Sequence, residues 1–314
     1  MAVSKIPQVK FWNGKTMPAL GLGTYLSTAG DVERAVKYAI NIGYRHIDTA
    51  FFYDNEKEIG NAVKEKINDG TVKREDLFIT TKLWNNTHAA DKVVPMCKKS
   101  LSNLGLDYVD LYLVHWPFGF KEGEELMPMN GDKIEYSDVD YTETWKGMEE
   151  CVNQGLAKSI GVSNFNSEQI KRVLDMAKIK PANNQIECSV NLNQKKLIDF
   201  CKSHDITVTG YAPLGRPGNQ RGIPNSLDNP VVLNIAKKYN KTPAQIACRY
   251  VYEQGAVPIP KSITESRIKE NMEFFDFTLT PDEMAAIESI GTGARTAGFP
   301  QISDHKYFPF GIPF

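Results

Sequence analysis

Short apolar runs alternate with amphipathic stretches along nearly the whole 314-residue chain, and this alternation limits the possible folds most strongly. Each run is typical of a buried strand, and each stretch that follows has helical periodicity. Eight strand–helix pairs predict a parallel (β/α)8 TIM barrel, with a doubly wound sheet in two domains as the alternative. The expected strands are 20–23, 44–48, 77–81, 109–114, 157–162, 183–187, 206–211 and 256–259, and the expected helices are 31–42, 56–68, 91–104, 142–154, 167–178, 194–203, 229–253 and 264–272.

A few segments fall outside this alternation. The dipeptide Asn13-Gly14 suits a tight primed turn, so an N-terminal β-hairpin is expected around it. Asn55 followed by Glu58 resembles a capping box, which predicts that the second helix begins there. Two long loops, 117–140 and 213–228, follow strands four and seven, and an irregular tail begins at Gly291. Because no linker or repeat is evident, we expect one domain over residues 1–314.

The overall composition excludes several classes of protein. A net charge of −1 and a pI near 6.5 provide no basic field for nucleic acid. No apolar run reaches the roughly 18 residues needed to span a membrane, and the N-terminus lacks the apolar core of a signal peptide. Five cysteines without a CxxC pair suit a reduced protein, and no histidine or cysteine spacing suggests a metal site. We therefore expect a cytoplasmic protein without nucleic-acid, membrane or metal partners.

Four polar residues stand at or just beyond the ends of three successive predicted strands: Asp48, Tyr53, Lys82 and His115. In a barrel these ends meet at one face, where active sites form. A phenol with an unperturbed pKa of about 10 is a poor acid near neutral pH, and a neighbouring ammonium group should lower that pKa. The carboxylate would hold the lysine charged, and the imidazole could orient a substrate oxygen. The set predicts proton transfer to a carbonyl oxygen without a metal.

The phosphate-binding candidate lies near the end of the chain. GLGTY at 21–25 lacks the third glycine of a dinucleotide fingerprint, which disfavours a Rossmann site. In PKSITESRIKEN at 260–271, Lys261 offers a point charge and Arg267 a planar fork, and this combination suits a phosphate monoester. Taken alone, the same segment could be a charged, solvated helix face.

Six strings occur in the order and at the spacing of one known family: GYRHIDTAFFYDNE, KLWN, LYLVHWP, GVSNF, NQIE and IPKSITESRIKEN. Over nearly its whole length the chain resembles the aldo-keto reductases. The resemblance implies a monomeric oxidoreductase that reduces aldehydes or ketones by direct hydride transfer from NADPH, with Tyr53 as the proton donor. It implies that the cofactor is bound by Gly23, Thr24, Ser163, Asn164, Gln185, Tyr211, Leu214, Lys261, Ser262, Thr264, Arg267, Glu270 and Asn271.

Aromatic residues after strands one, three and four predict an apolar wall that would bind a lipophilic carbonyl substrate. They are Tyr25, Trp84, Trp116 and Phe118. The chain departs from many family members at Ala212, where a serine would supply a hydroxyl contact to the cofactor. It also departs at Leu26 and Gly218, where those members carry a lysine and an aspartate that pair across the cofactor, so looser closure is expected.

Two other functions compete with carbonyl reduction. The first is a low-turnover NADPH-binding sensor or regulatory subunit on the same fold. The second is a metal-dependent barrel hydrolase or isomerase, which the absence of clustered histidines and carboxylates disfavours. His115 stands where family members that reduce steroid double bonds have a glutamate, and this favours reduction of a carbonyl group.

Overall fold

The structure is a computed structural model that describes residues 6–218, 222–312 and 314. Its main sheet has eight parallel strands in the order β12-β11-β10-β9-β6-β5-β4-β3. All eight strands lie where the alternation predicts them, within one or two residues at each end. They are β3 (Leu22–Gly23), β4 (His46–Asp48), β5 (Phe78–Leu83), β6 (Val109–Val114), β9 (Ala157–Ser163), β10 (Asn183–Glu187), β11 (Thr207–Tyr211) and β12 (Ala256–Ile259).

The first and last strands of this sheet meet and close it. The Gly21 N–H donates to the Pro258 carbonyl and the Gly23 N–H to the Pro260 carbonyl, both at 3.2 Å. Gly23 also forms a parallel bridge with Lys261. A Cβ on Gly23 would come within 2.8 Å of the Ile259 carbonyl oxygen, so glycine allows the two strands to approach. The predicted barrel is confirmed, and the open doubly wound sheet is excluded.

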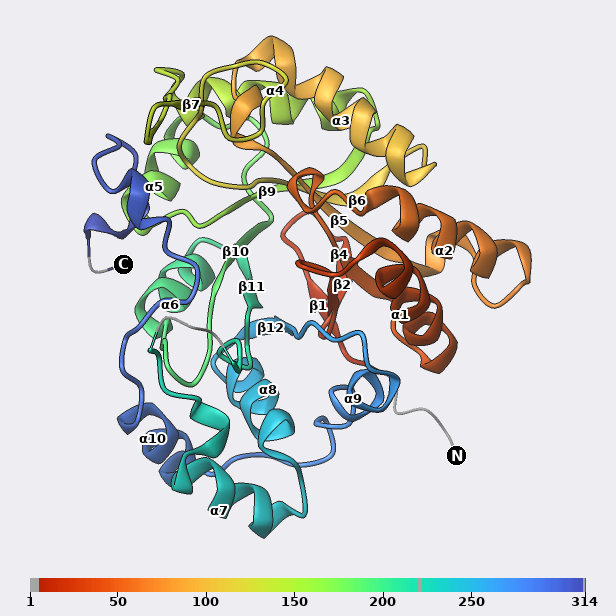
Figure 1. Cartoon of the computed structure of the whole chain (residues 1–314), viewed down its shortest axis with the longest axis vertical. Helices are drawn as coiled ribbons and strands as arrows, with labels where there is room; N and C mark the ends of the chain where they lie inside the picture. Colours follow the sequence, from red (N-terminus) through yellow and green to blue (C-terminus); the bar gives the residue numbers. More distant parts are fainter. Residues whose placement is uncertain (1–5, 219–221, 313) are drawn as a thin grey trace.

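Helices surround the barrel (Figure 1). Buried side chains on each helix recur every three or four residues, as on α1, where Val32, Val36 and Ala39 face the strands. The eight helices of the repeating pattern are α1 (Ala29–Ile42), α2 (Glu56–Asn68), α3 (Ala90–Leu104), α4 (Tyr141–Asn153), α5 (Ser167–Met176), α6 (Lys195–Ser203), α8 (Pro243–Glu253) and α9 (Glu265–Glu270), to which α7 (Pro230–Tyr239) and α10 (Pro281–Ser289) are added.

The single helix expected over 229–253 is wrong, because two helices occupy that segment. Asn240 ends α7 in the left-handed conformation, with φ +52°, which asparagine tolerates better than most residues. Thr242 then caps α8 by accepting a hydrogen bond from the Gln245 N–H, and Pro243 occupies the first helical position. Helix α10 was not expected either, although its Thr280 cap followed by Pro281 has the same form.

Helix α2 begins at the expected place but without the expected capping box. The Asn55 side chain makes no cap hydrogen bond. It donates instead to the Thr24 carbonyl at 3.0 Å and accepts from the Thr49 hydroxyl at 2.9 Å. This buried amide therefore joins the loops that follow β3 and β4, at the rim where the predicted site lies.

The predicted N-terminal hairpin is present as β1 (Gln8–Lys10) and β2 (Thr16–Pro18), which pair antiparallel. Its connection runs over residues 11–15 and is longer than the two-residue turn expected from Asn13-Gly14. Phe11 and Met17 pack against Phe78 and Val257 at the starts of barrel strands. The hairpin thus covers the end of the barrel opposite the predicted site.

The expected long loop and irregular tail are also present. The loop after β6 contains a small hairpin, β7 (Met129–Asn130) and β8 (Lys133–Ile134). In the described part of the tail, the regular structure after α10 consists of two short 3-10 turns, η5 (Pro300–Ile302) and η6 (Pro309–Gly311). Across the described ranges, no helix combines the length and apolar character needed to cross a membrane.

Candidate active site

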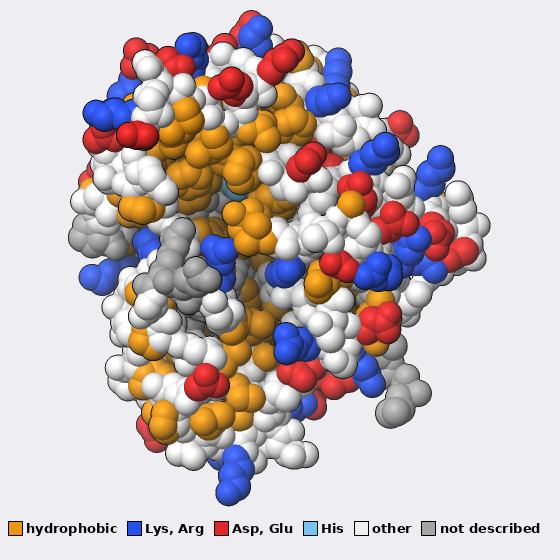
Figure 2. Space-filling model, in the orientation of Figure 1, with side chains coloured by type: hydrophobic (Ala, Val, Ile, Leu, Met, Phe, Trp, Pro, Cys, Tyr) orange, Lys and Arg blue, Asp and Glu red, His pale blue; other side chains and the backbone are white. Residues whose placement is uncertain are grey.

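A cleft of about 980 Å³ opens at the C-terminal ends of the barrel strands. In Figure 2, hydrophobic side chains gather in the upper centre of this face, and basic side chains lie nearer its middle. All of the predicted cofactor residues line the cleft, as do Asp48, Tyr53, His115, Tyr25, Trp84 and Trp116. The fold thus gathers these residues around one cleft.

Lys82 lies directly beneath the cleft and is fully buried. Its Nζ donates hydrogen bonds to Asp48 Oδ1 at 2.6 Å, to the Thr49 carbonyl at 2.8 Å and to the Tyr53 hydroxyl at 3.3 Å. The parallel register sets this geometry, because Asp48 on β4 pairs with Thr80 on β5. Lys82, two residues further along β5, projects from the same face of the strand. Its ammonium group therefore bridges the carboxylate and the phenol.

A second buried residue orients the carboxylate from across the barrel. Gln185 Nε2 donates to Asp48 Oδ2 at 2.7 Å, although the two residues are 137 positions apart in the chain. Sequence reasoning assigned Gln185 to the cofactor alone and missed this contact. No local pattern could reveal it, since it depends on closure of the barrel. Both oxygens of Asp48 thus have a donor, as a buried carboxylate requires.

Burial raises the pKa of Tyr53 well above its usual range, and the nearby Asp48 carboxylate raises it further. The sequence argument expected Lys82 to lower this pKa, whereas the net shift in the structure is upward. The cause is that loss of water around the phenol outweighs attraction to the ammonium. Tyr53 is consequently protonated at neutral pH, and Lys82 lies where it can stabilise the phenolate after the proton leaves.

Lys82 itself experiences opposing effects. Burial lowers the pKa of its ammonium group, while the charge of Asp48 and the hydrogen bond to Asp48 raise it. The carboxylate is thus the principal group that keeps a fully buried lysine charged.

His115 completes the predicted catalytic set at the side of the cleft. Its ring centroid lies 5.7 Å from that of Tyr53 and 5.1 Å from that of Trp84, edge-on in both cases. Burial lowers the pKa of His115 well below its usual value, and Lys82 lowers it further. The imidazole is therefore neutral near pH 7. It can donate a hydrogen bond without adding a positive charge.

Aromatic rings surround the catalytic end of the cleft. Phe52 stacks on Trp84 at 3.8 Å, and Phe299 from the tail lies 5.2 Å from Trp116. Phe118 differs from the expectation of substrate contact, because it is fully buried behind Trp116 and does not line the cleft. Sequence reasoning missed Phe52, which directly precedes Tyr53. Phe299 lies in the tail that was expected to be irregular.

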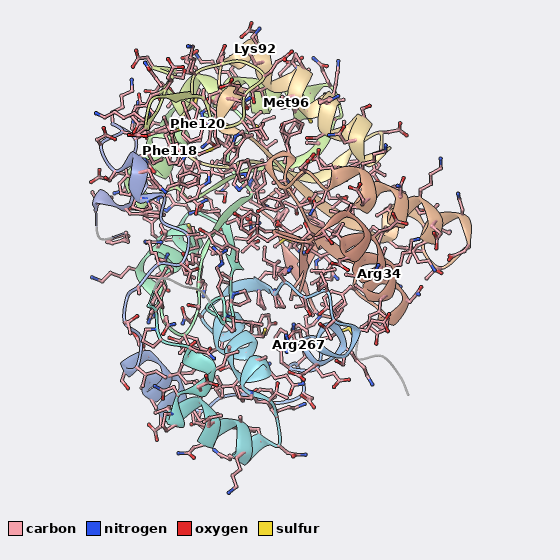
Figure 3. The ribbon with its side chains drawn as sticks, viewed as in Figure 1. Arg34, Lys92, Met96, Phe118, Phe120 and Arg267 are labelled. Atoms are coloured by element: carbon pink, nitrogen blue, oxygen red, sulfur yellow. The ribbon has the colours of Figure 1, made fainter. Side chains whose placement is uncertain are left out.

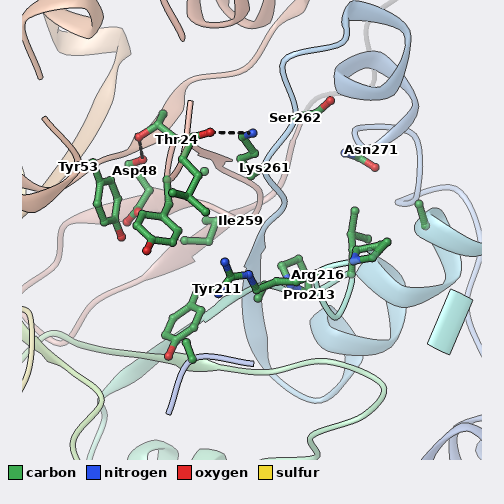
Figure 4. A pocket seen from close by; sticks show the side chains of 18 of the residues that line it. Thr24, Asp48, Tyr53, Tyr211, Pro213, Arg216, Ile259, Lys261, Ser262 and Asn271 are labelled. Atoms are coloured by element: carbon green, nitrogen blue, oxygen red, sulfur yellow. Dashed lines mark hydrogen bonds between the residues drawn. The ribbon is translucent and has the colours of Figure 1, made fainter. Parts of the chain in front are cut away.

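The opposite end of the cleft is basic and polar. Figure 3 shows Phe118 and Phe120 on one side of the barrel mouth and Arg267, on α9, on the other. Lys261 Nζ donates to the Leu26 carbonyl at 3.3 Å (Figure 4), and burial lowers its pKa. Within the described parts of the chain, the Arg267 side chain makes no hydrogen bond or ion pair, and the buried Asn271 amide makes no side-chain hydrogen bond. Arg267 is therefore able to bind an anion, and the Asn271 amide is able to bind a polar ring.

Between the two ends, polar side chains bond to one another along the rim. Asn164 Nδ2 donates to the His115 carbonyl at 3.0 Å and to Ser163 Oγ at 3.2 Å, and its Oδ1 accepts from the Tyr211 hydroxyl at 2.8 Å. Asn164 has φ +63°. Left-handed backbone of this kind gathers at functional sites. It recurs around the cleft at Leu26, Asn164, Ala212, Arg216 and Phe299.

The loop after β11 lies against both walls of the cleft. The Arg216 guanidinium lies 5.6 Å from the centre of the Tyr25 ring, and its Nη1 donates to the Thr296 carbonyl at 3.3 Å. Leu26 and Gly218 led us to expect that this loop closes loosely over the cofactor. Arg216 supplies a contact across the cleft that this expectation did not include. Part of the predicted 213–228 loop, residues 219–221, lies outside the described residues.

No group of three or more histidine, cysteine, aspartate or glutamate side chains within the described ranges could hold a metal ion. The arrangement is thus a half-buried phenol above a buried lysine and carboxylate, beside an apolar pocket, with a basic and polar groove leading away from it. The model of the Aldo/keto reductase family matches residues 19–292. The chain belongs to the aldo/keto reductase family.

This aldo-keto reductase is similar to its relatives over nearly their full length. It is 47% identical to aldo-keto reductase family 1 member A1-A of Danio rerio, with 96% of this chain and 97% of that one covered. It is 45% identical to prostaglandin F synthase 2 of Bos taurus, with 98% of each chain covered.

Solved structures agree with the fold of this aldo-keto reductase. The aldose reductase from Schistosoma japonicum has a TM-score of 0.94 and 43% identity, covering 98% of this chain and all of that one. The Bombyx mori aldo-keto reductase in complex with NADP has a TM-score of 0.90 and 41% identity, covering 97% and 99%.

Proposed function

We propose that the chain is an NADPH-dependent reductase that converts aldehydes or ketones to alcohols, with Tyr53 as the proton donor. The observation that carries this proposal is the position of the Lys82 ammonium, 2.6 Å from Asp48 and 3.3 Å from the Tyr53 hydroxyl, directly beneath the cleft. Similarity to an enzyme that binds NADP supports the cofactor. A sensor that only binds NADPH would not need a buried lysine between a carboxylate and a phenol.

The residues of the cleft fit the cofactor. NADPH, when bound, supplies the hydride. Lys261 and Arg267 offer two cations for its 2′-phosphate, together with the hydroxyls of Ser262 and Thr264. The buried Asn271 amide, whose side chain makes no hydrogen bond to another described residue, could bind adenine. Glu270 accepts a hydrogen bond from Thr242 at 2.7 Å and is thereby oriented beside Asn271. The remaining proposed contacts are Gly23, Thr24, Ser163, Asn164, Gln185, Tyr211 and Leu214.

The side chains at the base of the cleft carry out the proton transfer. Neutral His115 donates a hydrogen bond that orients the substrate carbonyl toward Tyr53. The O–H bond of Tyr53 breaks as its proton moves to the carbonyl oxygen, and Lys82 stabilises the resulting phenolate. Asp48 keeps Lys82 charged, and Gln185 holds Asp48 in place. These roles require a fixed network, which burial and the strand register provide.

We also propose that the substrate is a small, lipophilic carbonyl compound. Phe52, Trp84, Trp116 and Phe299 surround the catalytic end with ring faces and edges, and Tyr25 lies 4.9 Å from Tyr53.

We propose further that the enzyme is a cytoplasmic monomer. The compartment is supported by five cysteines that are all free and buried. Size-exclusion chromatography would test the oligomeric state.

Consumption of NADPH, followed by its absorbance, tests the main proposal against a panel of aromatic, aliphatic and acidic aldehydes and ketones. We expect turnover, fastest with aromatic carbonyls, and formation of the alcohol. Tight NADPH binding without turnover of any carbonyl would instead favour the sensor function.

A further inference from the structure

Glu187, at the end of β10, is a buried carboxylate that the proposed mechanism does not use. It accepts three hydrogen bonds from the C-terminal tail. The Thr296 N–H and hydroxyl donate to Oε1 at 2.7 and 2.6 Å, and the Ala297 N–H donates to Oε2 at 3.0 Å. Glu187 lies two residues after Gln185, so both side chains project from the same face of the strand.

Burial of a carboxylate is unfavourable unless its oxygens are hydrogen-bonded. No ion pair of Glu187 occurs among the described residues, so the tail itself supplies the stabilising donors. Two successive backbone N–H groups of the tail point at one carboxylate, and both Glu187 and Thr296 are 1% exposed. Such charge-assisted bonds fix the main chain of the tail to the end of a barrel strand.

The fixed segment leads directly into the apolar pocket. Three residues after Thr296, Phe299 adopts φ +45°, a conformation that is unfavourable for a bulky side chain. Strained backbone of this kind persists where its surroundings determine it. Docking at Thr296 and Ala297 restrains the segment before Phe299, and the Ile302 N–H, which donates to the Phe299 carbonyl at 3.1 Å, restrains the segment after it. The ring then lies 5.2 Å from Trp116 and 6.5 Å from Trp84.

We propose that Glu187 is a positioning residue that docks the tail over 296–299 and thereby places Phe299 against the aromatic wall of the substrate pocket. Loss of this docking widens the pocket and weakens selection among carbonyl substrates by size and shape. The inference rests on the proposed carbonyl reduction, because it concerns the pocket of that same site. It assigns a role to a residue that does not itself line the cleft, although it pairs with Tyr211 on the neighbouring strand.

The kinetic test uses Glu187→Gln and a matched pair at its partner. Thr296→Val removes one donor while keeping the shape of the side chain, and Thr296→Ser keeps the hydroxyl. We expect Glu187→Gln and Thr296→Val to raise KM for a bulky aromatic ketone about fivefold or more. KM for propanal and Kd for NADPH should change less than about twofold, and Thr296→Ser should resemble wild type.

Limited trypsin digestion tests the docking without relying on turnover, because Arg295 precedes Thr296 and supplies a cleavage site there. Mass spectrometry should detect faster cleavage between residues 295 and 296 in Glu187→Gln and Thr296→Val than in wild type or Thr296→Ser. If wild type reduces carbonyls but KM and cleavage are unchanged in both impaired variants, the role of Glu187 is overturned while the proposed function stands. If neither wild type nor any variant reduces carbonyls, the proposed function fails. In that case the digestion still tests the docking, and equal cleavage rates in wild type, Glu187→Gln and Thr296→Val would refute it.

Discussion

Replacing Asp48 with asparagine tests the electrostatic basis of the proposed site. The substitution keeps the size of the side chain but removes the charge beside a fully buried ammonium. Removing one partner of a buried ion pair typically costs about 3–5 kcal/mol of unfolding free energy. The amide oxygen of the new side chain could still accept from Lys82, and the Thr49 carbonyl and Tyr53 hydroxyl remain in place. We therefore expect a loss near the lower limit, about 3 kcal/mol.

The pH dependence of that loss identifies its cause. Burial lowers the pKa of Lys82, and Asp48 opposes this effect, so Asp48→Asn should lower the pKa of Lys82 further. At pH values between the lowered pKa of Lys82 in the folded variant and the ordinary pKa of lysine in the unfolded chain, the unfolded chain binds more protons. The free energy of unfolding of the variant should therefore rise with pH. Urea unfolding at pH 7, 8 and 9 should show a deficit, relative to wild type, that shrinks as pH rises. A deficit that is the same at all three values would refute the electrostatic reasoning and indicate a packing defect.

Further predictions address the other roles. Tyr53→Phe should lower kcat by roughly 10²–10⁴-fold and leave NADPH affinity unchanged in a fluorescence titration; retention of most of the rate would exclude Tyr53 as the acid. Arg267→Ala should weaken NADPH about tenfold or more, through loss of a charge-assisted bond, while NADH binds as before; equal weakening of both cofactors would mean that Arg267 only supports its helix. Trp116→Ala should raise KM for bulky apolar carbonyls and spare Kd for NADPH, and the assignment fails if both constants change together. Burial lowers the pKa of His88 to about 3 in the folded chain. Below about pH 6.5 the unfolded chain therefore binds a proton at His88 that the folded chain does not, and this should lower the free energy of unfolding by up to about 1.4 kcal/mol per pH unit. His88→Leu should reduce the slope of urea stability against pH between 6.5 and 5, and an unchanged slope would contradict this.

The sequence predicted the barrel because its signals are local. Each strand is a short apolar run, and each helix a periodic stretch, so strand positions and the ends that carry Asp48, Lys82 and His115 could be located from neighbouring residues alone. Predictions of helix boundaries and caps were wrong where a local signal was compatible with two structures. Asn240 and Pro243 divide what periodicity suggested was one helix, and the side chain of Asn55 bonds across the rim instead of capping its helix.

Contacts and energies that depend on closure of the barrel could not be predicted in this way. The hydrogen bond between Gln185 and Asp48 joins positions 137 residues apart, and that between Thr296 and Glu187 joins positions 109 apart. The direction of the Tyr53 pKa depends on how far the folded chain buries the phenol, which no motif encodes. Phe118 likewise follows the expected strand, yet its ring is buried behind Trp116.

The junction between β3 and β12 links completion of folding to cofactor binding. Gly23 and Lys261, which pair there, lie 238 positions apart, so their contact requires a long loop to close. Both residues also line the proposed cofactor groove, so each side of that groove comes from a different end of the chain. A partly synthesised or partly folded barrel therefore has no complete groove to offer. Binding of NADPH would select molecules whose barrel has closed, and would stabilise this long-range contact.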